Sequence, residues 1–277
     1  MDWAAAAAAF AENGAVPLAV WNALVEGWLT HVVEARGPTA RWSRSQNFLL
    51  VETTADDRGR HALQWANDIR AFLLRHLDGI AEPHSSPLPL LLFTQQSDYI
   101  DWHVDYEADL AGEELASSGG MFVNGPCPHI AAPLGLHLEA VLAHELTHAL
   151  VRHLPLPLWL NEGFAVAMES LWTRQPPQLS TEDIAEHRHL WSPTSIQRFW
   201  SGQAFRDTTL QKVAYQLAHV LATRLAGNYD RLCRFANDAM ADDAGAAAFA
   251  TTYGEDLRNL LQPMLGRGDW QPSPERW

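Results

Sequence analysis

Two histidines and a glutamate stand together in a pattern that can hold and use a metal ion. His144 and His148 are four residues apart, and Glu145 directly follows the first of them. On a helix this spacing puts both imidazoles on one face, where each can reach the same ion at about 2.0–2.1 Å. Glu145 is then placed to act on a water bound to that ion. The pattern predicts a zinc-binding helix, and the competing interpretation is a buried helix whose histidines are satisfied by ordinary hydrogen bonds.

The residues around this pattern favour a helix. The stretch 138–151 contains neither Gly nor Pro and is rich in Ala and Leu. Leu142, Leu146, Ala149 and Leu150 form an apolar stripe on the face away from the histidines. We therefore expect this helix to be buried against the rest of the domain.

Glu162 is the candidate for a third ligand. Pro155 and Pro157 should end the first helix, and Asn161 is the expected N-cap of a second apolar helix over residues 162–171. A carboxylate in the first turn of a helix packed on the first would complete the set. Two His, one Glu and an open water position are typical of a catalytic zinc site. We expect a single Zn²⁺ per chain.

These two pieces resemble the gluzincin metallopeptidases, in which H-E-x-x-H is followed by a downstream Glu ligand. The nearest group is the peptidase-MA-like one with a W-L-N-E-G-x-A signature, found here at residues 159–165. The resemblance covers about residues 119–225. It implies zinc ligands His144, His148 and Glu162, with Glu145 as the general base.

The resemblance also implies a strand that binds substrate. Residues 121–124 and 129–132 are predicted to form a hairpin or edge strand just before the metal helix. In zincins an edge strand here pairs with the extended substrate backbone, and the resemblance puts this role on the following residues: His129, Ile130, Ala131 and Ala132. The stretch 119–123 lacks the Glu with which related aminopeptidases grip a substrate amine, so we expect cleavage that needs no free N-terminus.

The resemblance finally implies a hydrogen-bond donor for the oxyanion on a helix near residues 213–219. Tyr215 and His219 are four residues apart and share a helix face. The A-Y-Q run favours Tyr215, and the alternative is a core tyrosine with a surface histidine.

Glu169 lies on the same helix face as Glu162, where it either orients a ligand histidine or is a solvated carboxylate.

Composition narrows the class of protein. The chain has 277 residues, of which 47% are hydrophobic and 19% charged, as in an ordinary globular protein. A net charge of −14 argues against nucleic acid and anionic membranes as partners. No apolar run is long enough for a membrane span, and the start lacks the basic residue of a signal peptide, so we expect a cytoplasmic location. Cys127 and Cys233 are predicted to be buried thiols.

The order of predicted elements indicates an α+β fold. We expect a helical extension at 1–40, an α+β lobe at 41–154 whose small mixed sheet covers the metal helix, and a helical lobe at 155–277. The zincin-like character follows from the resemblance. His103, His187 and His189 are expected to be exposed on helices. The predicted strands are 47–51 and 88–94, and the predicted helices are 1–36, 61–77, 96–106, 138–151, 162–171, 181–190, 195–200, 210–225, 229–240 and 246–265.

The sequence therefore predicts a zinc peptidase acting on a peptide or protein substrate through metal-activated water. Two alternatives remain open. One is a catalytically idle gluzincin fold that serves as a binding module, which the presence of Glu145 disfavours. The other is a zinc hydrolase of a non-peptide amide or ester. The oligomeric state is left open.

Overall fold

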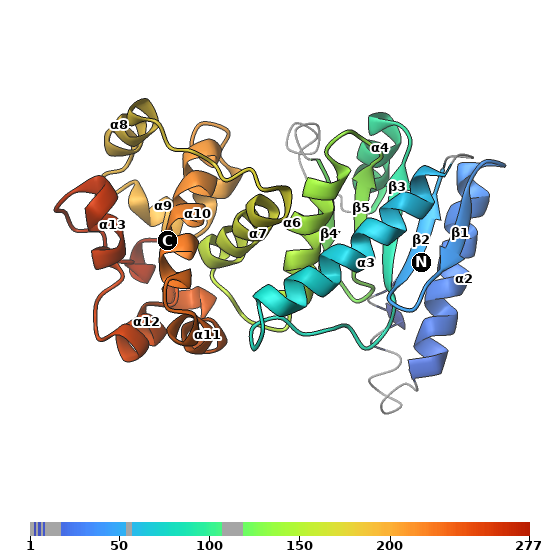
Figure 1. The fold of residues 1–277 in the computed structure, drawn as a ribbon, viewed down its shortest axis with the longest axis horizontal. Helices are drawn as coiled ribbons and strands as arrows, with labels where there is room; N and C mark the ends of the chain where they lie inside the picture. The colour runs from blue at the N-terminus through green and yellow to red at the C-terminus, as the bar shows by residue number, and fades with distance from the viewer. Residues whose placement is uncertain (1–2, 4, 7, 9–17, 54–56, 107–118) are drawn as a thin grey trace. The chain divides into compact units, whose positions relative to one another are not determined.

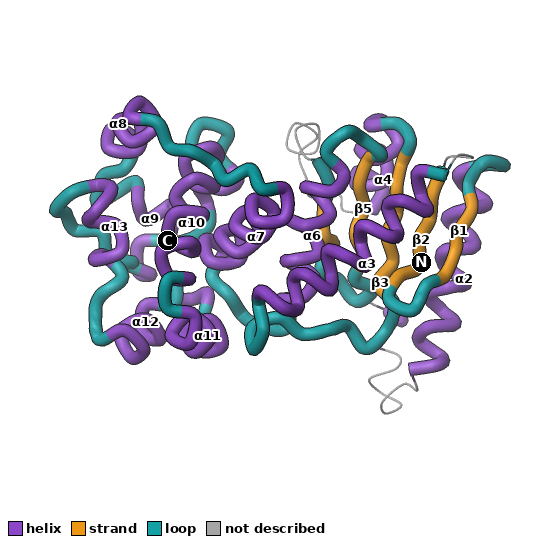
Figure 2. The backbone as a smooth tube through the Cα atoms, in the orientation of Figure 1, coloured by secondary structure: helices purple, strands orange, loops and turns teal. Residues whose placement is uncertain are grey.

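The computed structural model describes residues 3, 5, 6, 8, 18–53, 57–106 and 119–277 (Figure 1). Contacts within the chain divide it into two units, one formed by residues 1–75 and 83–150 and the other by residues 76–82 and 151–277. The first mixes helices with a five-stranded sheet and the second has only helices among its regular elements (Figure 2). The fold is α+β.

The sheet has the order β1-β2-β3-β5-β4. Its three central strands, β2 (Phe48–Glu52), β3 (Leu88–Phe93) and β5 (His129–Pro133), are parallel. The short strands β1 (Arg41–Arg44) and β4 (Met121–Val123) pair antiparallel at the two ends. Every residue of β2 and β3 is buried, as expected for parallel strands covered on both faces. The sequence had indicated all of these strands except β1, which is polar and mostly exposed.

Helices cover both faces of this sheet. Alternate strand residues face opposite sides. On one side they pack against α2 (Leu18–Arg36) and α4 (Gln96–Tyr106). On the other side lie α3 (Arg58–His76), which crosses in front of the strands in Figure 1, and α6 (Leu138–Val151). The cluster on the α2 and α4 side contains Val25, Trp28, Leu29, Val32, Leu49, Val51, Leu91, Phe93, Tyr99, Trp102 and Ala131.

Contacts at Gly120 place α6 against the sheet. A Cβ at this glycine would lie 2.4 Å from Cγ1 of Val141 and 3.1 Å from Cβ of Ala132. Gly119 and Gly120 are therefore packed closely against Val141 of α6. The helix itself spans the predicted residues 138–151.

The second unit is built around α7 (Leu158–Thr173) and α10 (Gln211–Ala226), which pack on each other. Buried aromatic rings fill the space beside them, with Trp159 edge-on to Trp200 and stacked on Phe235. The other helices are α8 (Thr181–Leu190), α9 (Ile196–Trp200), α11 (Tyr229–Asp238), α12 (Ala246–Tyr253) and α13 (Arg258–Leu265), with three short 3₁₀ turns at Gln203–Arg206, Ala241–Asp243 and Pro274–Arg276.

The end of α12 and the extent of this unit differ from the sequence prediction. The helix expected over 246–265 is broken at Gly254, whose φ of 72° ends α12 in the left-handed conformation that glycine adopts easily. Residues 76–82 also join this unit, since Tyr229 donates a hydrogen bond to the Asp78 carbonyl at 2.8 Å and Asn237 donates one to the Gly79 carbonyl at 2.8 Å. Among the described residues, no helix combines the length and apolar character that a membrane crossing requires.

Candidate metal centre

The two histidines lie as predicted on one face of α6. Their rings are 4.9 Å apart between centroids and inclined at 75°. Both are partly exposed, while Leu142, Leu146 and Ala149 on the opposite side are buried. The predicted apolar stripe therefore anchors the helix and leaves the imidazoles accessible.

Glu162 lies on α7, although not at its start. The helix begins at Leu158 after Pro157, so the prediction that Asn161 caps it is wrong. Pro157 fixes extended backbone, and the apolar residues Trp159 and Leu160 then continue into the core as helix. Glu162 is consequently in the second turn, with 9% of its surface exposed.

The structure brings the three predicted ligands together. One ligand atom from each of His144, His148 and Glu162 lies within 4.8 Å of the other two. Atoms bound tetrahedrally to one zinc ion at 2.0–2.2 Å are about 3.4 Å apart, so modest side-chain adjustments would let the three share an ion. Two imidazoles and a carboxylate are also a donor set that zinc accepts. The residues present therefore fit a zinc ion.

Glu145 directly follows the candidate ligand His144 in the chain. Its side chain is buried and is held by a hydrogen bond from the sheet. Its Oε2 accepts a hydrogen bond of 2.7 Å from the backbone N–H of Phe122 in β4. Because Phe122 donates to this side chain, its N–H points away from β5 and toward the outer side of β4. Only 8% of the surface of Glu145 is exposed. The carboxylate is thus fixed at the outer edge of the end strand.

The predicted substrate strand lies elsewhere in the sheet than expected. β5 is paired on both sides, with β3 and with β4, so the expectation that residues 129–132 form an edge is wrong. His129, Ile130, Ala131 and Ala132 are fully buried. The predicted hairpin is present, but its first strand, β4, is the end of the sheet. The sequence could not decide between the two strands because both are short and apolar.

His129 belongs to an aromatic cluster inside the first unit. Its Nδ1 lies 2.9 Å from the Cys127 carbonyl, which can only accept, so Nδ1 carries the proton. Its ring lies against Trp28 and Trp102. Burial lowers the pKa of His129 to about 4, with a smaller contribution from the nearby His103.

His103 lies in the same cluster, edge-on to Tyr99. It is fully buried, so the prediction of an exposed histidine is wrong. Within the described residues neither of its ring nitrogens has a hydrogen bond, and burial lowers its pKa to about 4. Cys127 nearby is a buried free thiol, as predicted, whereas Cys233 is only partly buried.

The two candidate oxyanion donors lie on α10. Tyr215 is partly buried, with its ring edge-on to Phe205 at 5.3 Å. His219 is also partly buried, and its Nε2 lies 3.3 Å from Oγ1 of Thr223. Burial lowers the pKa of His219, and the negative charge of Glu169 on α7 acts in the opposite direction. Both residues therefore keep the positions on one helix face that the sequence predicted.

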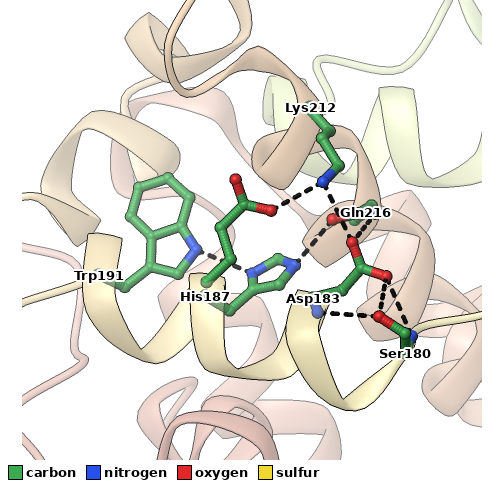
Figure 3. Close-up of polar contacts among 7 residues, drawn as sticks. Ser180, Asp183, His187, Trp191, Lys212 and Gln216 are labelled. Carbon is green, nitrogen blue, oxygen red and sulfur yellow. Dashed lines mark hydrogen bonds and ion pairs between the residues drawn. The ribbon is translucent and has the colours of Figure 1, made fainter.

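A polar network joins α10 to α8 (Figure 3). Trp191 donates from Nε1 to Nδ1 of His187 at 3.1 Å, so Nε2 of His187 carries the proton and donates to Oε1 of Gln216 at 3.2 Å. His187 is fully buried, so the prediction of a surface histidine is wrong, whereas His189 is exposed as expected. The side-chain amide of Gln216 continues the chain to Asp183 at 3.4 Å.

The start of α8 is built as predicted and completes this network. Ser180 caps the helix and forms a reciprocal capping box with Asp183. Lys212 on α10 contacts both Asp183, at 3.1 Å, and Glu186, at 2.7 Å. Hydrogen bonds to Ser180, and to a lesser degree those to Lys212 and Gln216, hold the pKa of Asp183 well below its usual range. α8 is thereby tied to α10 at the residue next to Tyr215.

No protein-family model matches the chain, and no curated protein is similar to it at a significant level. The spacing in the sequence was enough to identify the candidate ligands and Glu145. The sequence did not reveal the contact between Glu145 and Phe122 and the network around His187, because both join segments far apart in the chain.

Proposed function

We propose that this protein is a zinc-dependent peptidase of the gluzincin type, with a zincin-like arrangement of its sheet and metal helix. The observation that carries the proposal is the grouping of His144, His148 and Glu162 within 4.8 Å, with Glu145 next to the first ligand. This donor set leaves a coordination position for water, as catalytic zinc sites do and structural ones do not.

A bound zinc ion would lower the pKa of a coordinated water to about 7 and polarise the scissile carbonyl. Glu145 then accepts the proton of the attacking water and delivers it to the leaving amine. The Phe122 N–H holds Oε2 at 2.7 Å, which leaves Oε1 to receive the proton. The backbone bond thus fixes the orientation of the base before substrate binds.

β4 is the strand that supports substrate binding in this proposal. It ends the sheet, and its outer side carries the N–H that holds Glu145. An extended peptide adding to this side would lie along the general base. We therefore assign the substrate-binding role to residues 121–123 and not to residues 129–132, where the resemblance placed it.

Tyr215 or His219 supplies the donor to the developing oxyanion in this scheme. A phenol can donate a hydrogen bond while neutral, and Tyr215 is the preferred candidate. The reaction needs such a donor because the carbonyl oxygen becomes negatively charged as water adds.

The proposal is tested by incubating the purified, zinc-loaded protein with an unbiased peptide library and mapping any cleavage sites by mass spectrometry. We expect internal cleavage that stops when a zinc chelator is added and returns with Zn²⁺. The same assay with Glu145→Gln distinguishes this protein's activity from a contaminating peptidase. Cleavage that survives both chelation and this substitution would contradict the proposal.

A further inference from the structure

Gly163, the residue after Glu162, lies where α7 touches α10. A Cβ at this position would be 2.7 Å from the carbonyl oxygen of Ala218 and 2.9 Å from Cβ of Ala222. Both distances are below 3.0 Å, and Cβ atoms in real structures essentially never lie that close to another heavy atom. The closer of the two atoms belongs to the backbone, so it cannot rotate away. Any side chain at 163 must therefore push the two helices apart.

The face of α10 that receives Gly163 also carries the two candidate donors. Tyr215, Ala218 and Ala222 follow the three- and four-residue spacing of one helix face, and His219 is one turn beyond Tyr215. Gly163 is adjacent to Glu162 on α7. The contact at Ala218 consequently sets how far Tyr215 and His219 stand from Glu162.

α10 is also held from the side of α8. Gln216, next to Tyr215, accepts the hydrogen bond from buried His187 and reaches Asp183. These bonds restrain the rotation and axial position of α10, while the glycine contact sets its separation from α7. An alanine would suit the interior of α7 better than glycine does, so a helix-forming role alone does not account for Gly163.

We propose that Gly163 is a positioning residue that brings the donor face of α10 up to the Glu162 ligand. This inference rests on the proposed peptidase function. It assigns no chemical step to Gly163, which acts only through the separation of the two helices. A displacement of about 1 Å is enough to cost on the order of 10²-fold in rate when a catalytic group must meet a reacting atom.

The test begins with Gly163→Ala in the full chain. We expect kcat to fall on the order of 10²-fold, while KM and the zinc content stay within about twofold of wild type, because Glu162 itself is retained. Adding Ala222→Gly removes the contact with Cβ of Ala222 but leaves the closer contact with the Ala218 carbonyl, so the double variant should recover part of the loss in kcat and not all of it. A structural role unrelated to the site would lower the amount of folded protein without this split between kcat and KM.

Gly27→Ala is the matched control. Gly27 lies inside α2, and a Cβ there would meet nothing within 4 Å. We expect unchanged kcat and zinc content with equal or greater thermal stability, since only the helix propensity changes.

If Gly163→Ala does not fold, Ala222→Val enlarges the same contact from α10 and should give the same fall in kcat.

A second readout does not depend on activity. Crystal structures of wild type and Gly163→Ala should show the Cα atoms of Tyr215 and Glu162 moving apart by roughly 0.5–1 Å, as overpacked helices do. Unchanged kcat, loss of zinc together with kcat, or no displacement of α10 would each overturn the positioning role. A wild type that holds zinc and cleaves no peptide would instead contradict the proposed function, whatever the displacement.

Discussion

The first unit contains two pairs of histidines in opposite environments. His144 and His148 are partly exposed on α6 and lie with a carboxylate. His103 and His129 are fully buried among Trp and Tyr rings, and burial lowers the pKa of each to about 4.

The difference shows what makes a histidine useful as a ligand. To bind a metal ion, an imidazole must face it together with other donor atoms. The buried pair does not meet this condition within the described residues, where the metal-compatible group includes only His144, His148 and Glu162. The buried imidazoles instead act as neutral core side chains whose protonation would oppose folding.

The largest effect is expected at Glu145, the proposed general base of the exposed site. Glu145→Gln keeps the shape of the side chain and removes its ability to accept a proton, so kcat should fall by about 10²–10⁴-fold. Zinc content and thermal stability should stay near wild type, because Glu145 is not a ligand. Glu139→Gln, on the first turn of the same helix, is the control and should leave kcat unchanged. Wild-type turnover in Glu145→Gln would refute the mechanism.

A smaller loss is expected on α10. Tyr215→Phe removes one hydroxyl and should lower kcat by about 10²-fold if that hydroxyl stabilises the oxyanion. His219→Ala should then have a milder effect. Steady-state kinetics on a cleaved library peptide measures both, with zinc content checked in parallel. The opposite ranking would transfer the role to His219, and full activity in both variants would remove α10 from the mechanism.

The smallest effect concerns the buried pair and appears in stability. The folded pKa of about 4 for His103 and His129 lies below the unfolded value of 6.5. Unfolding therefore takes up protons between these values, so their contribution to stability is complete above about pH 6.5 and is lost as the pH falls toward 4. Thermal melts should show the melting temperature decreasing over this range.

His103→Leu sharpens this test. The variant removes a titrating group that has no hydrogen bond within the described residues, so the melting temperature at pH 7 should change by no more than about 2–4 °C. Its decrease between pH 6.5 and 4 should be smaller than in wild type. His189→Leu, at an exposed position on α8, should leave the pH dependence as it is. An equally steep decrease in His103→Leu would mean that other groups cause the acid sensitivity.

The sequence predicted the environment of the exposed histidine pair but not that of the buried pair, and the reason is physical. The spacing of His144 and His148 on a Gly- and Pro-free helix is a local property, so it can be read without the fold. The burial of α4 around His103 depends on rings from α2 and β5, because Trp28 and His129, which lie far away in the chain, both pack on the neighbouring Trp102. The local sequence predicted an exposed position on a helix for His103, and tertiary packing overrides that signal.

The same reason explains the other errors. The strands were predicted well where apolar runs are long, as in β2 and β3. The order of strands in the sheet is a non-local property, so the sequence wrongly predicted that β5, and not β4, lies at the edge. Asn161 is a good N-cap by type, yet α7 starts after Pro157, four residues earlier than predicted. The closeness of α7 and α10 at Gly163 likewise has no signal beyond a glycine within a helical pattern.

The central claim is that His144, His148 and Glu162 share one zinc ion, and metal analysis tests it most directly. Wild type, Glu162→Ala and His103→Leu are purified without added chelator, and their zinc content is measured by elemental analysis. We predict about one zinc per chain in wild type and in His103→Leu, and strong loss in Glu162→Ala because two imidazoles alone bind zinc weakly. A wild type without zinc, or a Glu162→Ala variant that holds it as tightly as wild type does, would contradict the account.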